Sequence, residues 1–197
     1  MTNLSKYAVA AILLLSFLPL GYQFLNQKMS AEEIFAANFT TEKILDLKNQ
    51  RSFEEDSSSK TKSPEDLKIA QNLLTRSKAI AFYNGKNYPE AINLFKSYLA
   101  SDTRIKNKSE TELYLAKAYL ADNKPIEAKK TLLIIIKEGK KSTKQEAEWY
   151  LVLTLIKQDN IEQAKKGLNE ILLSKITPAH KDKALKLQQQ IDKYYVQ

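Results

Sequence analysis

Cysteine is absent from the sequence, and histidine occurs once, as His180. The lack of cysteine excludes disulfides, thiolate catalysis and cysteine-ligated zinc. A single histidine also argues against a Ser–His–Asp array and against a histidine-rich metal site. Because His180 falls near an expected helix start, we predict a solvent-exposed imidazole there. The sequence therefore predicts a protein that is not an enzyme, with no metal and no cofactor.

Glycine and proline are scarce, with four and five residues in a chain of 197. So few turn-forming residues favour long helices, and we predict an all-α fold. Capping residues, or a proline at the first helical position, indicate four helix starts, at Ser63, Ser109, Thr143 and Thr177. Breaks between helices are expected at 84–87, 121–124 and 157–160.

Arginine is rare, since only three of the 31 basic residues are Arg, and no nucleic-acid-binding motif is present. The excess positive charge is nevertheless local, because residues 64–197 hold 24 Lys and Arg against 16 Asp and Glu. The simplest interpretation is a solvated, lysine-rich surface. The alternative is a basic surface that binds acidic proteins, anionic lipid or nucleic acid, although the composition argues against nucleic acid.

The one long uncharged run, 7–25, is 19 residues long, close to the roughly 20 that a membrane-spanning helix needs. Tyr7 and Tyr22 suit the two membrane interfaces, and Lys6 precedes the span. We predict a single-pass anchor with residues 1–6 in the cytoplasm and the rest in a bacterial periplasm. The alternative is a cleaved signal peptide that releases a soluble periplasmic module.

Residues 26–63 are predicted to be a linker with some local structure. Apolar side chains at 34, 35 and 39 indicate a short amphipathic helix, and Ile44 and Leu45 could form a further turn. Residues 54–63 are polar and charged and contain no aromatic ring. They cannot bury enough apolar surface to offset their ordering entropy, so we expect this end of the linker to be flexible.

The remainder of the chain repeats itself. Three segments that begin at Ala79, Ala116 and Val152 align, and they place small residues at Ala91, Ala128 and Ala164. These alanines are 37 and then 36 residues apart. A period of this length with two helices per unit is typical of a helical solenoid.

The pattern resembles the tetratricopeptide repeat (TPR), whose period is about 34 residues. Alanines 79 and 116, rings at 82 and 119, and the three alanines above occupy the packing positions of that family. The resemblance implies an α-solenoid of about three helix–turn–helix repeats over 64–178, followed by a capping helix over 179–197. Pro125 and Val152 depart from the pattern, and only the first unit has the favoured turn glycine, Gly85.

The same resemblance implies a function. TPR domains usually hold a protein or peptide in the concave face formed by the first helix of each unit. In this register the face would present Arg76, Tyr83, Asn84, Tyr114, Lys117, Trp149, Tyr150 and Lys157. Some of these rings could instead be core, with Tyr114 and Tyr150 the first candidates.

A chaperone-tail clamp fits poorly, since Glu146 would repel a carboxylate. We therefore expect a membrane-tethered adaptor within a bacterial envelope complex, with an unidentified protein or peptide as partner and an oligomeric state that the sequence leaves open.

Overall fold

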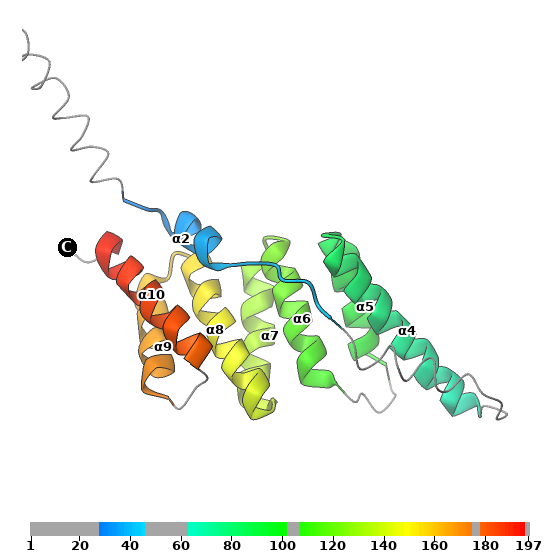
Figure 1. Ribbon diagram of the computed structural model, residues 1–197. Coiled ribbons are helices and arrows are strands. Elements are labelled where there is room, and N and C mark those ends of the chain that lie inside the picture. The colour runs from blue at the N-terminus through cyan, green and yellow to red at the C-terminus, as the bar shows by residue number, and fades with distance from the viewer. Residues whose placement is uncertain (1–27, 46–62, 102–106, 175–177, 196–197) are drawn as a thin grey trace, which may run out of the picture. The chain divides into compact units, whose positions relative to one another are not determined.

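The computed structural model describes residues 28–45, 63–101, 107–174 and 178–195 (Figure 1). Within these residues the chain forms α-helices and no strand, which confirms the all-α expectation. The helices are α2 (Ala31–Asn38), α4 (Pro64–Asn84), α5 (Tyr88–Leu99), α6 (Lys108–Ala121), α7 (Pro125–Glu138), α8 (Lys141–Lys157), α9 (Ile161–Leu173) and α10 (Pro178–Tyr195).

The expected membrane anchor at 7–25 lies outside the described residues, as does most of the polar stretch at 54–63. Of the helices in the described ranges, none combines the length and the apolar character that crossing a bilayer requires. The compact unit considered below begins at Ala31.

The helix starts were predicted with mixed success. Ser63 is the N-cap of α4, where its hydroxyl accepts a hydrogen bond of 3.2 Å from the Asp66 N–H and the Asp66 carboxylate accepts one of 3.0 Å from the Ser63 N–H. The predicted caps at Ser109 and Thr143 are wrong, because α6 begins at Lys108 and α8 at Lys141. Thr143 lies inside the first turn, and its hydroxyl donates to the Lys140 carbonyl at 3.1 Å instead of accepting from the backbone.

The breaks between paired helices fall where they were expected, and all three have the same backbone form. In each, one non-glycine residue is left-handed: Lys86, Asn123 and Asp159, with φ of 62°, 56° and 55°. The next residue donates its N–H five positions back, in Asn87→Phe82 (2.9 Å), Lys124→Tyr119 (2.8 Å) and Asn160→Leu155 (2.8 Å). This is the Schellman form of helix ending. Gly85, with φ of −81°, is not the left-handed residue.

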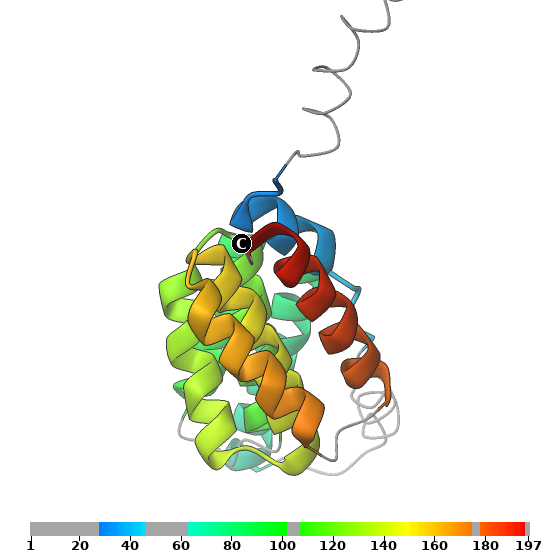
Figure 2. The same ribbon diagram turned by 90° about the vertical axis from the view of Figure 1, so that its left-hand side faces the viewer.

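Each helix from α4 to α10 packs against the next one along the chain. The alanines of the repeat, Ala91, Ala128 and Ala164, are completely buried in the second helix of each pair. A side chain this small allows close approach of two helices. Figure 2 shows α7 and α9 on one side of this arrangement, α10 on the other, and α2 across the top.

Val152, which departs from the repeat pattern, is matched by a change in the helix that it faces. A Cβ added to Gly167 in α9 would lie 2.9 Å from Cγ2 of Val152 in α8, closer than such atoms normally approach. The third pair therefore places its larger side chain on the first helix and its glycine on the second. This exchange keeps the helices close despite the loss of alanine at 152.

Candidate peptide-binding face

Helices α4, α6 and α8 contribute to a common face, and residues 31–45 lie across it (Figure 1). We call these residues the covering segment. Its helical part, α2, packs against α8 and α10, and its irregular part, 39–45, reaches the C-terminal end of α4. The amphipathic helix was predicted within a linker, whereas the further turn expected around Ile44 is not helical.

The helical part is held by apolar burial and by one lysine. Ile34 and Phe35 are buried, with 0% and 5% of their surface exposed. Lys157 of α8 places its Nζ 2.8 Å from Glu32 Oε1 and 4.3 Å from the centre of the Phe35 ring. One ammonium thus makes an ion pair and a cation–π contact with successive turns of α2. Asn38 adds a hydrogen bond of 2.8 Å to Gln190 of α10.

The middle of the covering segment rests on aromatic rings. Phe39 stacks on Phe35 with ring centres 4.9 Å apart and meets the Tyr150 ring edge-on at 6.3 Å. Lys117 of α6 makes a cation–π contact with the same Tyr150 ring, with Nζ 5.1 Å from the ring centre. Edge-on and stacked arrangements are the preferred geometries of aromatic pairs.

At its far end, the covering segment is held by its main chain. The Asn84 side-chain oxygen accepts a hydrogen bond of 2.8 Å from the Ile44 N–H, and its amide donates one of 3.0 Å to the Ile44 carbonyl. A side-chain amide can pair in this way with any peptide unit, whatever the side chain. The Ile44 side chain is buried in the same apolar cluster as Ile80 and Tyr83 of α4.

Burial changes the acidity of three groups beneath the covering segment. It raises the pKa of the Tyr83 and Tyr150 hydroxyls and lowers the pKa of the Lys117 ammonium. The Glu42 carboxylate acts on all three, and its negative charge raises each pKa. The Tyr83 hydroxyl is buried and has no hydrogen-bond partner in the described part of the chain.

Five of the eight predicted partner-binding residues therefore surround the covering segment. They are Tyr83, Asn84, Lys117, Tyr150 and Lys157. In this structure, what lies on that face is a stretch of the same chain.

Arg76 and Tyr114 are instead engaged between α4 and α6. Arg76 is fully buried, and its Nε donates to Thr111 Oγ1 at 2.9 Å. Its Nη2 lies 3.3 Å from Glu110 Oε2, and its Cζ stands 5.6 Å from the centre of the Tyr114 ring. Tyr114 donates its hydroxyl to the other oxygen of Glu110 at 2.8 Å. These groups hold two helix pairs together.

Trp149, the remaining predicted residue, is buried with 4% of its surface exposed. Its ring faces His180 of α10, with centres 6.5 Å apart. The expectation of a solvent-exposed His180 is wrong, since only 8% of its surface is exposed and its Nε2 lies 2.9 Å from Glu146 Oε1. Helix α10 begins over α8, and this brings the imidazole onto the indole.

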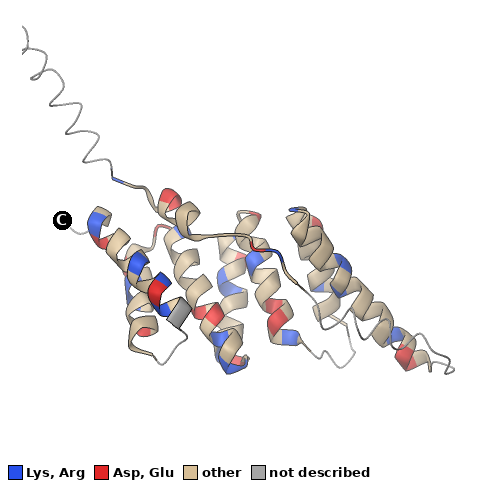
Figure 3. Cartoon of the chain, in the orientation of Figure 1, with Lys and Arg blue, Asp and Glu red and all other residues tan. Residues whose placement is uncertain are grey.

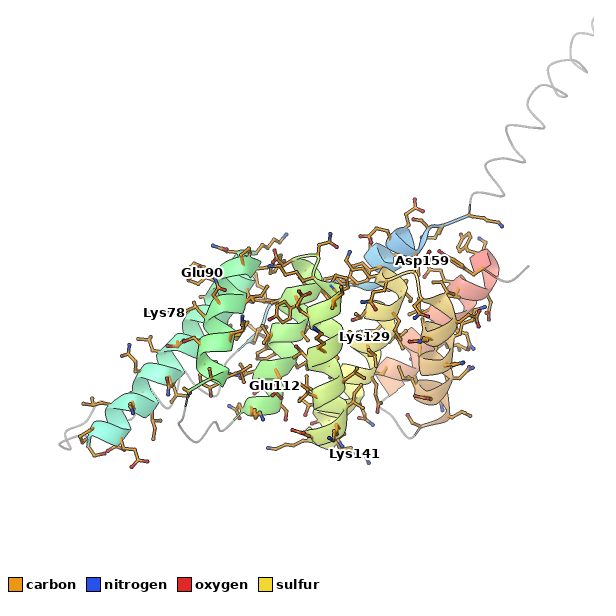
Figure 4. All side chains as sticks on the ribbon, turned by 180° about the vertical axis from the view of Figure 1, so that it is seen from behind. Lys78, Glu90, Glu112, Lys129, Lys141 and Asp159 are labelled. Carbon is orange, nitrogen blue, oxygen red and sulfur yellow. The ribbon has the colours of Figure 1, made fainter. Side chains whose placement is uncertain are left out.

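Charged side chains of both signs are interspersed over the described helices (Figure 3). From behind, Lys129 on α7 and Lys141 at the start of α8 are seen on the outer surface (Figure 4). In the ranges that the structure describes, no three His, Asp or Glu side chains are grouped so that they could hold a metal ion.

The residues of the candidate site that sequence reasoning missed belong to the covering segment: Glu32, Phe35, Phe39, Glu42 and Ile44. The available signal was the pair of phenylalanines four residues apart, which marks one apolar helix face. Nothing in the sequence says which surface that face covers. No protein-family model, no curated protein and no solved structure matches this chain.

Proposed function

We propose that this protein is a membrane-tethered, non-enzymatic adaptor whose repeats bind a peptide segment of another protein. The repeats form a TPR-like α-solenoid of three helix pairs closed by α10, and residues 7–25 are the anchor that places them in a bacterial periplasm. The same turn at the end of three first helices supports the repeat, as do the buried alanines at its fixed positions.

The observation that carries the proposal is the two-fold hydrogen bonding between Asn84 and the main chain of Ile44. Any buried peptide unit needs hydrogen-bond partners, and here a side chain of the repeats supplies both of them. Such a pairing suits a peptide-binding surface, because the main chain is common to all its ligands. Lys157 also supports peptide binding, since its ammonium contacts a carboxylate and an aromatic ring of the covering segment at the same time.

A binding test follows from these two residues. The purified full chain is applied to an array of random 15-residue peptides, and bound peptides are remeasured in solution. The comparison is made in a chain that also carries Glu32→Lys and Glu42→Lys, because Asn84 and Lys157 hold the covering segment as well and its loss would otherwise offset the effect. In that chain, Asn84→Ala with Lys157→Ala should weaken binding by tenfold or more, because groups central to an interface commonly carry most of its affinity.

The control for that test is Lys129→Ala with Lys166→Ala, which removes two lysines from second helices and should leave binding unchanged. Binding to no peptide, or equal binding by the two double variants, would contradict the proposal. The anchor is tested separately: the chain should stay in the membrane pellet after a carbonate wash, and its intact mass should include residues 1–25.

A further inference from the structure

The covering segment shows what kind of ligand this face accepts. Its contacts fall into three kinds: Asn84 pairs with the main chain, Tyr150 and Lys157 contact phenylalanine rings, and Lys157 of α8 pairs with the Glu32 carboxylate. The Glu42 carboxylate adds a negative charge that raises the pKa of Lys117 of α6. Only the first kind is independent of sequence. The other two require particular side chains at particular distances along the ligand.

We infer that the face binds acidic, aromatic peptides built like the covering segment, with two phenylalanines four residues apart, one acid before them and one after. The ligand turns from a short helix into irregular chain, and the covering segment leaves when it binds. This inference rests on the proposed function and names the partner by its chemistry.

Charge complementarity explains the acids. Lys157 has only 7% of its side chain exposed, and Glu32 is the acid that meets it. Lys117 is half-buried, and Glu42 and Glu146 are the carboxylates that act on it, while Lys183 of α10 opposes them. A ligand with a neutral or basic side chain in place of Glu42 would remove one of the negative charges near Lys117. The half-buried ammonium would then be less well compensated.

The covering segment is also an imperfect occupant. It leaves the Tyr83 hydroxyl buried and without a hydrogen-bond partner in the described residues, although Tyr83 belongs to the same apolar cluster as Ile44. A ligand that presents an acceptor at this point gains a hydrogen bond that the covering segment does not make. A tethered segment competes at an effective concentration in the millimolar range, so a displacing ligand needs such an advantage.

The first experiment measures whether the site is open to a free peptide. The probe is a fluorescent synthetic peptide of residues 31–45, added to the full chain and followed by anisotropy. In the variant Glu32→Lys with Glu42→Lys, the covering segment carries positive charge toward Lys157 and Lys117 and should detach. We expect this variant to bind the probe at least tenfold more tightly than the unaltered chain, because the tethered competitor is removed.

The matched control is Glu138→Lys with Glu170→Lys. It makes the same change in net charge on α7 and α9, and we expect it to bind the probe like the unaltered chain. In the variant Glu32→Lys with Glu42→Lys, the amides of residues 31–45 should exchange faster with solvent than in the unaltered chain. The amide exchange rates of helices α4 to α10 should stay unchanged. Equal probe binding by the two double variants would overturn the inference.

The second experiment tests which side chains of the peptide and of the protein are required for binding. In the variant with the detached segment, probes with Phe39→Ala or Glu42→Lys should bind at least tenfold more weakly, and adding Asn84→Ala to the protein should do the same.

The remaining outcomes separate this inference from the proposed function. If random-library peptides bind through Asn84 and Lys157 while the 31–45 probe does not, the inference falls and the proposed function stands. If no peptide binds, both fall. If the unaltered chain has the mass of two chains in solution and exchanges the segment between them, a second copy is the occupant and the inference is overturned.

Discussion

Arg76 of α4 donates a hydrogen bond of 2.9 Å from Nε to Thr111 Oγ1 of α6, while the same hydroxyl donates to the Asn107 carbonyl at 2.9 Å. The hydroxyl is thus both acceptor and donor, and it links a fully buried guanidinium to the backbone of the next helix pair. A buried cation needs such partners, because water does not reach it.

Thr111→Val should therefore lower the free energy of unfolding by about 1–3 kcal/mol, the usual cost of leaving a buried donor without its acceptor. Denaturant unfolding followed by circular dichroism measures this change. The control is Thr131→Val, which removes a hydroxyl that donates to the Glu127 carbonyl of its own helix. If both substitutions lower the free energy of unfolding equally, the contact between Arg76 and Thr111 does not contribute to stability.

Two tyrosines of the first helices should respond in opposite ways to loss of the hydroxyl. Tyr83→Phe removes a buried group without a hydrogen-bond partner among the described residues, so the free energy of unfolding should stay the same or rise by about 1 kcal/mol. Tyr114→Phe removes the hydrogen bond of 2.8 Å to Glu110 and should lower it by a similar amount. Thermal melts of both variants decide the matter, and destabilisation by Tyr83→Phe would mean that this hydroxyl has a partner in solution.

The exchange of sizes between Val152 and Gly167 predicts non-additive effects. Gly167→Ala should gain little, although alanine favours a helix by about 1 kcal/mol, because its Cβ would lie 2.9 Å from Val152 Cγ2. In the background Val152→Ala the same substitution should be stabilising. A double-mutant cycle measured by denaturant unfolding should give a coupling of 0.5 kcal/mol or more. Simple additivity would show that the two helices adjust freely at this point.

Lys117 gives a prediction about pH. Burial lowers its pKa below 10.5, despite the carboxylates of Glu42 and Glu146, so the unfolded chain binds this proton more tightly than the folded chain. Stability therefore rises with pH through the interval between the lowered pKa and 10.5. Lys117→Met should be the more stable protein at neutral pH, and its advantage should shrink as the pH approaches 10.5. The difference between the two unfolding free energies across this range is the measurement, and a difference independent of pH would contradict the lowered pKa.

The helix pairs could be predicted from the sequence because their signals are local. The three breaks follow from short polar runs, and the buried alanines follow from their spacing. The caps at Ser109 and Thr143 failed for a local reason as well, since a serine or threonine near a helix start can equally well serve as an interior residue whose hydroxyl bonds to the preceding turn.

The covering segment was beyond this reasoning, because its contacts join residues far apart in the chain. An apolar stripe with Phe35 and Phe39 predicts that a face is buried, but the surface that buries it is set by the packing of α8 and α10. His180 failed for the same reason. Its exposure depends on where α10 crosses Trp149, and no periodicity in the sequence specifies that crossing.

The hydrogen bond between Asn38 and Gln190 joins residues 152 positions apart, so the two ends of this contact are made at different times. At translation rates of 5–20 residues per second, roughly 8–30 s separate the synthesis of Asn38 from that of Gln190. The helix pairs near the amino terminus can form on the ribosome during this interval, since their contacts are between neighbours. The covering segment, by contrast, is among the first parts of the chain to be made and among the last to be seated. A nascent chain therefore displays its phenylalanines before α8 and α10 exist to cover them.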